Sequence, residues 1–220
     1  MDTSAARTAI FNRIRSAKHR PAQPEQAELD LVQQYLAQHT GGPRPDLGAD
    51  LTERFRQQAL RTSQTLDEVA TMNDVPAAAA RYLEGLQLEK KAIAWETLNG
   101  LPWQDSGVAV EFRPPVNLDL VGITSCFCAV AETGTLMMLS GAQTFASASL
   151  LPETHIAIVP VDRIVGSIED AFTLAKAERG ELPRATNFIS GPSRTGDIEQ
   201  TIVLGAHGPY RVHVILVRQS

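Results

Sequence analysis

Apolar runs in the second half of the chain constrain its fold more than any other feature. They lack the alternation of polar and apolar side chains that marks a half-exposed strand. The runs cover residues 121–131, 136–139, 156–161 and 212–217. Strands of this kind are covered on both faces, as they are in parallel sheets between layers of helices. Because helical patterns alternate with them, the sequence predicts an α/β protein with three αβα layers and a mostly parallel sheet.

The other expected elements follow from local signals. Asp50 with Glu53 three residues later resembles a capping box that opens a helix, and Pro76 suits the first turn of another helix over 75–86. A helix is also expected over 168–177, and a short one over 197–204 that Gly205 closes. The remaining expected strands are 66–72, 91–95, 108–112 and 186–189.

The first 45 residues differ in composition from the rest. Helical patterns at 6–17 and 25–38 are separated and ended by segments rich in Pro and Gly. Residues 1–20 carry five basic side chains against Asp2 alone, which we interpret as a solvated face rather than an interaction arm. We therefore expect an N-terminal helical extension, 1–45, followed by one α/β domain, 46–220.

Composition excludes several classes of protein. The formal net charge of −5 argues against general affinity for nucleic acid. No apolar run approaches the roughly 18 residues of a membrane span, and the first residues do not resemble a signal peptide, so we expect a cytoplasmic protein. The two cysteines, Cys126 and Cys128, cannot complete a zinc or iron–sulfur site, so no metal or cofactor is expected within this chain.

The first candidate for chemistry is the turn Glu132-Thr133-Gly134-Thr135, directly after an apolar run. Glycine allows a tight turn, and ligands of open α/β sheets gather at strand ends. Desolvation beside the strand favours the protonated form of a carboxyl group, which suits Glu132 to act as acid, base or nucleophile. The alternative is a β-hairpin turn in which Glu132 points to water.

The second candidate lies between an expected strand and the expected helix at 197–204. Backbone N–H groups of a Gly/Ser loop that enters a helix N-terminus can bind an anion, and the guanidinium of Arg194 can pair with it. The alternative is ordinary helix capping by Ser193 or Thr195. The candidate binding residues are Ser190, Gly191, Ser193, Arg194, Thr195, Asp197 and Glu199.

Histidine provides a third candidate. His207 lies in a turn after Gly205, and only histidine has an ordinary pKa suited to proton transfer near neutrality. The alternative for His207 is a structural hydrogen bond. His155 and His213 lie in expected strands and are interpreted as packing residues.

Several segments, in their order along the chain, resemble the lactate-utilisation (LUD) domain family, in its lactate-utilisation protein C (YkgG-like) branch. The segments that carry the resemblance are Val121-Gly122-Ile123-Thr124, Ala131-Glu132-Thr133-Gly134-Thr135, Ser149-Leu150-Leu151-Pro152, the run 190–199, and Gly205-Ala206-His207-Gly208-Pro209. The resemblance implies a three-layer αβα fold like that of the CoA-transferase and ribose-phosphate-isomerase group. It also implies a role in oxidising L-lactate to pyruvate beside partner proteins that carry the iron–sulfur clusters.

Three hypotheses follow. In the first, the chain is an accessory subunit of lactate oxidation that binds a small anionic ligand such as lactate, with Arg194 as the anion partner and Glu132 or His207 as the proton-transfer group. In the second, it is an independent small-molecule transferase or isomerase of CoA-transferase-like type, with Glu132 as nucleophile or base. In the third, it is a scaffold subunit without a ligand.

Overall fold

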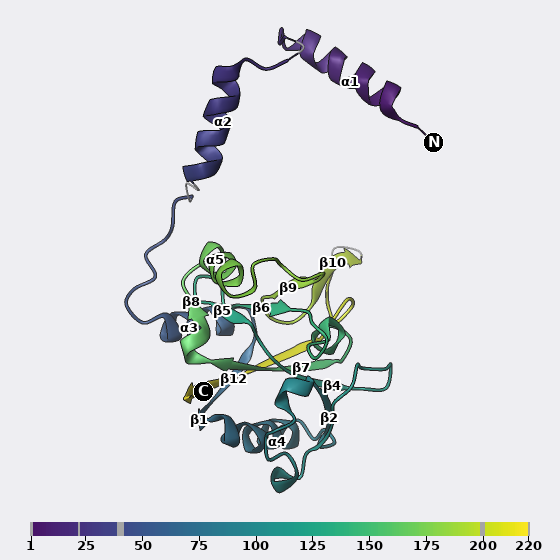
Figure 1. The fold of residues 1–220 in the computed structure, drawn as a ribbon. Helices are drawn as coiled ribbons and strands as arrows, with labels where there is room; N and C mark the ends of the chain where they lie inside the picture. The colour runs from purple at the N-terminus through teal and green to yellow at the C-terminus, as the bar shows by residue number, and fades with distance from the viewer. Residues whose placement is uncertain (1, 22, 39–41, 199–200, 220) are drawn as a thin grey trace. The chain divides into compact units, whose positions relative to one another are not determined.

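A computed structural model describes residues 2–21, 23–38, 42–198 and 201–219, with residues 197, 198, 201 and 202 described by their backbone only. The chain divides into two compact units, Met1–Arg44 and Pro45–Ser220. The elements of both units are labelled in Figure 1.

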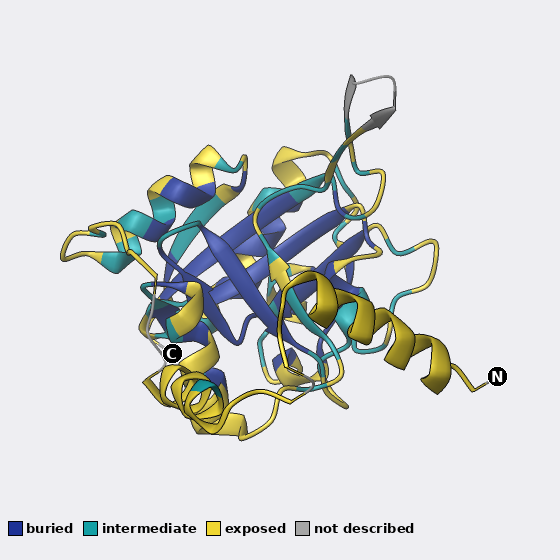
Figure 2. Ribbon diagram, turned by 90° about the horizontal axis from the view of Figure 1, so that it is seen from above, coloured by how far each residue is buried: buried dark blue, intermediate teal, exposed yellow. Residues whose placement is uncertain are grey.

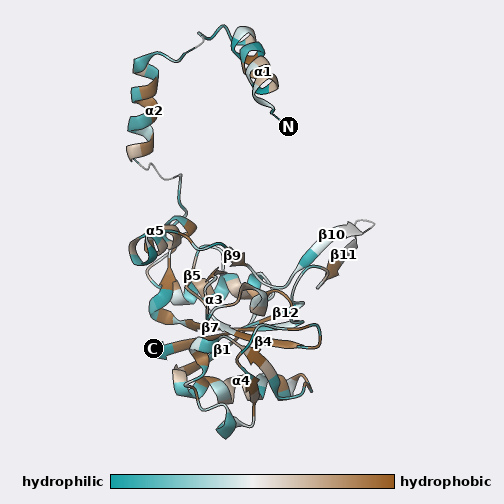
Figure 3. Ribbon diagram, turned by 45° about the vertical axis from the view of Figure 1, so that its right-hand side comes forward, coloured by the Kyte–Doolittle hydropathy of each residue, from teal (hydrophilic) through white to brown (hydrophobic). Residues whose placement is uncertain are grey.

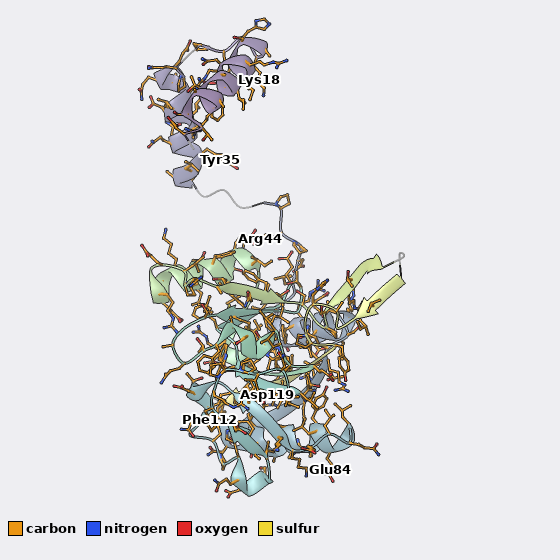
Figure 4. The ribbon with its side chains drawn as sticks, turned by 90° about the vertical axis from the view of Figure 1, so that its right-hand side faces the viewer. Lys18, Tyr35, Arg44, Glu84, Phe112 and Asp119 are labelled. Atoms are coloured by element: carbon orange, nitrogen blue, oxygen red, sulfur yellow. The ribbon has the colours of Figure 1, made fainter. Side chains whose placement is uncertain are left out.

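The N-terminal unit consists of two helices. Helix α1 spans Ser4–Ala17 and helix α2 spans Gln26–Gln38, and neither buries a residue. Lys18 and Tyr35 project from this unit in Figure 4, and Tyr35 is exposed. Arg20 forms an ion pair with Glu28 at 2.7 Å.

The second unit is built on a six-stranded sheet in the order β1-β12-β7-β4-β2-β3. Every neighbouring pair in this sheet is parallel. The strands are β1 Thr65–Thr71, β2 Lys91–Ala94, β3 Ala109–Glu111, β4 Val121–Ser125, β7 Thr154–Pro160 and β12 Arg211–Gln219. The expected mostly parallel central sheet flanked by helices is confirmed.

Helices and a second layer of strands cover this central sheet. Helix α4, Val75–Gly85, lies below it in Figure 1, and helix α3, Leu51–Arg61, lies on the other side. Phe55 of α3 and Leu83 of α4 are fully buried against the same core as Ile156 of β7. Figure 2 shows the central strands almost entirely buried, and Figure 3 shows that they are hydrophobic. The unbroken apolar runs are therefore explained by burial on both faces.

A second, smaller sheet was not expected. Its strands run in the order β8-β5-β6-β9, with β5 parallel to β8 and the other two pairs antiparallel. The strands are β5 Cys128–Val130, β6 Thr135–Leu139, β8 Ile164–Val165 and β9 Thr186–Ile189. Helix α5, Ile168–Arg179, packs on it through Ala171 and Ala175 and forms a separate apolar cluster with Phe127 and Met137.

Two sequence predictions are wrong. The run 121–131 is two strands in different sheets, because the chain leaves the central sheet after β4 and begins β5 at Cys128. The helix expected over 197–204 is an antiparallel hairpin of β10, Arg194–Ile198, and β11, Thr201–Leu204. Thr195 and Val203 pair across this hairpin, as β-branched residues do readily.

Candidate functional site

The turn Glu132–Thr135 connects β5 to β6, so it is the hairpin turn that the sequence offered as an alternative. Gly134 has φ +67°, and its N–H donates to the carbonyl of Val130 at 3.0 Å. A Cβ at this position would lie 2.5 Å from the backbone nitrogen of Ala59 in α3. Glycine is therefore required at position 134 for two reasons: the backbone has a positive φ there, and α3 approaches too closely to leave room for a Cβ.

A chain of hydroxyl groups joins this turn to the loop after β9. Thr133 Oγ1 lies 2.6 Å from Thr135 Oγ1, which lies 2.6 Å from Ser190 Oγ. Thr135 is buried, whereas Ser190 is exposed. The structure thus brings together the first and second candidate segments, 55 residues apart in sequence.

The connection between α3 and β1, residues 62–64, also packs against these two segments, and no sequence pattern pointed to it. We call the turn 132–135, the loop 190–193 and the connection 62–64 together the loop cluster. Gln64 is buried and donates from Nε2 to the carbonyl of Gly134 at 2.7 Å. Its Oε1 is buried with no hydrogen-bond partner in the described part of the chain. A Cβ on Gly191, which has φ +87°, would lie 2.1 Å from the carbonyl oxygen of Thr62. The stretch 62–65 carries only ordinary polar residues after a helix, so no sequence signal marked it.

The segment 190–199, where an anion site was expected at the N-terminus of a helix, does not lead into a helix. Arg194 and Thr195 lie in β10, so the favourable end of a helix dipole is missing there. The exposed Arg194 guanidinium instead donates to Ser63 Oγ. Ser193 donates its N–H to the carbonyl of Pro209 at 2.8 Å. The side chain of Asp197 and the whole of Glu199 lie outside the described residues.

The two expected proton-transfer groups lie in different surroundings. Glu132 is half-buried, and no hydrogen bond or ion pair to its carboxylate occurs within the residues described. His207 is exposed in the turn before β12, and the next residue, Gly208, lies against Ser193. In the same described ranges, no hydrogen bond or ion pair joins the His207 ring to Glu132. The structure therefore shows no acid–base pair of these two residues.

Comparisons with known proteins identify the family. The sequence profile of the LUD domain matches residues 52–217. The chain belongs to the LUD domain family. It is 33% identical over 179 residues to a lactate utilization protein C from Exiguobacterium, an alignment covering 76% of this chain and 78% of that protein.

Two further relatives agree with this result. A lactate utilization protein C from Halalkalibacterium halodurans is 42% identical over 100 residues, but this stretch covers only 44% of this chain and 44% of that protein. The crystal structure of a DUF162 family protein from Deinococcus radiodurans aligns with a TM-score of 0.60 and 26% identity, covering 79% of this chain and 100% of that one. The sequence resemblance to the family is confirmed.

The buried histidines of this LUD domain are packing residues, as expected. His155 places Nε2 2.8 Å from Thr124 Oγ1, and His213 places Nδ1 2.8 Å from Thr65 Oγ1. The His213 ring also stacks on Tyr82, with centroids 3.7 Å apart. Burial lowers the pKa of each histidine to about 4. Both rings are therefore neutral at pH 7.

The cysteines of this LUD domain are both free and buried. They pack in different clusters, Cys126 with the central sheet and Cys128 with α5, because the strand breaks between them. Burial raises the pKa of both thiols, that of Cys128 to about 11. Among the described residues, no group of three or more His, Cys, Asp or Glu side chains is placed to hold a metal ion. None of the helices described has the length and apolar character needed to cross a bilayer.

Proposed function

We propose that this LUD domain protein serves the oxidation of L-lactate to pyruvate as an accessory subunit that works with iron–sulfur partner proteins. The observation that carries the proposal is the 33% identity, over three quarters of each chain, to a protein named lactate utilization protein C. The cysteine content supports the division of labour. This chain has two cysteines, and both are buried in apolar clusters, so the iron–sulfur ligands belong to the partners.

The proposed ligand is a small organic anion such as lactate, held between the turn Glu132–Thr135 and the loop 190–193. The contact between Thr135 and Ser190 supports this location because it joins the two segments. Arg194 supplies the positive charge that a carboxylate needs. The Oε1 of Gln64 is buried in this cluster and has no hydrogen-bond donor among the described residues, so one acceptor of the cluster is unsatisfied there.

Oxidation of a 2-hydroxy acid removes the hydroxyl proton and a hydride equivalent from the same carbinol group. If the chemistry takes place on this subunit, Glu132 or His207 accepts the proton, and the electrons leave to a partner protein. Glu132 is favoured for this role because its half-buried carboxylate has no hydrogen bond or ion pair within the residues that the structure describes.

Growth on lactate tests the proposal. A strain that lacks its own copy of the gene is complemented with wild type, Arg194→Ala or the control Arg184→Ala, which also removes an exposed arginine. We expect Arg194→Ala to abolish growth on lactate while partner capture and thermal stability stay normal, and Arg184→Ala to grow. The proposal is contradicted if the strain still grows on lactate both after deletion of the gene and with Arg194→Ala.

Ligand binding is measured separately by thermal shift of the purified protein with lactate, pyruvate and other small anions. At 100 times the dissociation constant, a ligand stabilises the native state by about 2.7 kcal/mol. A shift that disappears in Arg194→Ala supports the anion site. Equal shifts in wild type and Arg194→Ala place the anion elsewhere.

A scaffold without a ligand is the second candidate. The hydroxyl groups of Thr133, Thr135 and Ser190 already satisfy one another, an arrangement that fastens two loops without any ligand. On this hypothesis Arg194→Ala leaves lactate growth intact, and Thr135→Val lowers thermal stability without changing any ligand response.

An independent transferase or isomerase is the third candidate, favoured by the carboxylate of Glu132, which has no partner in the described part of the chain. Here the isolated protein turns over acyl-CoA or sugar phosphates, and Glu132→Gln abolishes that turnover. An isolated wild-type protein without such activity removes this candidate.

A further inference from the structure

Both helices of the N-terminal unit carry large apolar side chains that are exposed to solvent. Ile10 of α1 is 59% exposed, and Leu36 of α2 is 62% exposed. Neither helix buries a residue, and helices of 14 and 13 residues are marginal in water unless they pack against another surface. Burial of these side chains against a partner therefore stabilises the helices themselves.

The apolar side chains of α1 form a stripe that has basic residues beside it. The members of the stripe recur every three or four residues and are Ala6, Ile10, Ile14 and Ala17. Arg13 lies three residues after Ile10, and Lys18 lies four residues after Ile14, so both are neighbours of the stripe near the end of the helix. Helix α1 contains no acidic residue, so its stripe has a purely basic border.

Helix α2 has a stripe of the same kind with the opposite charge beside it. Leu29, Val32 and Leu36 share one face of the helix, and all three are exposed. Glu25 lies four residues before Leu29, and Glu28 lies four residues before Val32, so both carboxylates adjoin the stripe where the helix begins. Helix α2 contains no basic residue. The unit therefore presents two amphipathic helices of nearly equal length and opposite charge.

The opposite charges of α1 and α2 decide which partner can cover both stripes. An anionic membrane or an acidic protein attracts α1 but repels α2, and a basic surface does the reverse. A second copy of this chain attracts both helices, because its own α2 can face α1 while its α1 faces α2. The ion pair between Arg20 and Glu28 within one chain is exposed at both side chains, so it contributes little and leaves the carboxylate accessible to a second copy.

We propose that this protein forms a two-fold symmetric dimer in which α1 of one copy packs antiparallel against α2 of the other. The antiparallel direction brings Arg13 and Lys18, near the end of α1, beside Glu25 and Glu28, at the start of α2 of the second copy. Symmetry repeats this contact, and the four helices form a bundle with the apolar stripes inside. The basic side chains then lie at an interface rather than on the solvated face that the sequence favoured. This inference does not depend on the proposed role in lactate oxidation.

Sedimentation equilibrium of the full chain tests the dimer, with an expected mass of twice the 23.9 kDa of one chain. Two charge-reversed variants test the pairing of α1 with α2. The double variant Arg13→Glu/Lys18→Glu makes both helices acidic at the contact, and Glu25→Lys/Glu28→Lys makes both basic. Each variant alone should dimerise at least about tenfold more weakly than wild type, because like charges then face each other. An equal mixture of the two should restore the dimer, because the acidic α1 of one variant meets the basic α2 of the other.

The control variants Arg15→Glu and Asp30→Lys reverse a charge on another face of each helix. Neither residue lies three or four positions from a member of a stripe, and the Arg15 guanidinium lies 5.9 Å from the centre of the Phe11 ring. Both controls should dimerise like wild type.

Three results overturn the proposal. The first is a wild-type chain that remains monomeric at about 100 µM, which would also be the result if α1 and α2 were covered within one chain. The second is full dimerisation of each charge-reversed variant alone, which places the interface elsewhere. The third is a mixture of the two variants that remains monomeric. Lactate growth is a separate readout, so failure here is distinguishable from failure of the proposed function.

Discussion

The two sheets of this LUD domain differ in size and strand direction, and in both the inner strands are more buried than the edge strands. Strand β7 of the central sheet and β6 of the second sheet are buried along almost their whole length, whereas the edge strands β3 and β9 are half-exposed or exposed. The central sheet also holds both buried histidines, and the second sheet carries the turn Glu132–Thr135. The difference teaches that the central sheet provides the stable core, while the candidate site lies where the second sheet and its loops meet it.

Lowering the pH is expected to have the largest effect on stability, and this effect arises in the central sheet. His155 and His213 are neutral in the native central sheet because burial lowers the pKa of each to about 4, and their ordinary value is 6.5. Well above pH 6.5, both the native and the unfolded state are unprotonated at these rings. As the pH falls from 6.5 to 4, the unfolded state takes up protons and the native state does not, so each histidine costs roughly 3 kcal/mol of stability. Urea unfolding at pH 7.5, 5.5 and 4.5 measures the loss.

The carboxylates act in a different pH window. Ion pairs with Arg56 and Arg218 lower the pKa of Glu68 below its ordinary 4.5, so its stabilisation is lost only at lower pH. A loss between pH 6.5 and 4.5 therefore belongs to the histidines. The His213→Gln variant should show about half of the wild-type loss in this window, and an unchanged slope would contradict the assignment.

Overpacking the central sheet gives the next largest effect. A Cβ on Gly122 in β4 would lie 2.1 Å from the carbonyl oxygen of Ala148 and 2.9 Å from Cγ of Pro152. Gly122→Ala should therefore cost about 3 kcal/mol, because both neighbours are buried and cannot move away easily. Chemical unfolding measures it, with Gly85→Ala, which meets open space, as the control. A loss below about 1 kcal/mol would show that the segment 148–152, which packs on β4, can move away from it.

The matching change in the loop cluster is Gly191→Ala. Its Cβ would also lie 2.1 Å from a carbonyl oxygen, that of Thr62, and φ is +87°. Because the loop 190–193 is more exposed than β4, it can shift, and we expect a smaller loss of about 1–2 kcal/mol. Equal losses in Gly191→Ala and Gly122→Ala, measured by urea unfolding, would show that the loop cluster is as rigid as the central sheet.

The fold was predictable where burial is complete. Strands β7 and β12 are apolar over most of their length, and the cap of α3 and Pro76 in α4 are local signals that the structure confirms. The hairpin β10–β11 was mistaken for a helix because Gly205 suited a helix end. The β-branched residues Thr201 and Val203 in fact favour a strand. The split of 121–131 escaped because a continuous apolar run does not show where a chain changes sheets.

The candidate site was predictable only in part. The glycine turn at 134 follows from sequence, since its positive φ is a local property. The contacts of Thr135 with Ser190 and of Gln64 with Gly134 join residues 55 and 70 apart, so tertiary packing decides them.

Removal of a helix cap is expected to have the smallest effect on stability. It can be compared between α3, which packs on the central sheet, and α5, which packs on the second sheet. Asp50 caps α3 on the central core by accepting from the N–H groups of Thr52 and Glu53, both at 3.0 Å. Ser167 caps α5 on the second sheet, and its hydroxyl also donates to Asp170 in a reciprocal box. Ala substitution at either cap should cost about 1 kcal/mol. The Ser167→Ala loss should be the larger, because Ser167 is buried and water cannot replace its hydrogen bonds, whereas Asp50 is exposed. Thermal unfolding of both variants checks this order, and the reverse order would mean that α5 opens to solvent more readily than α3.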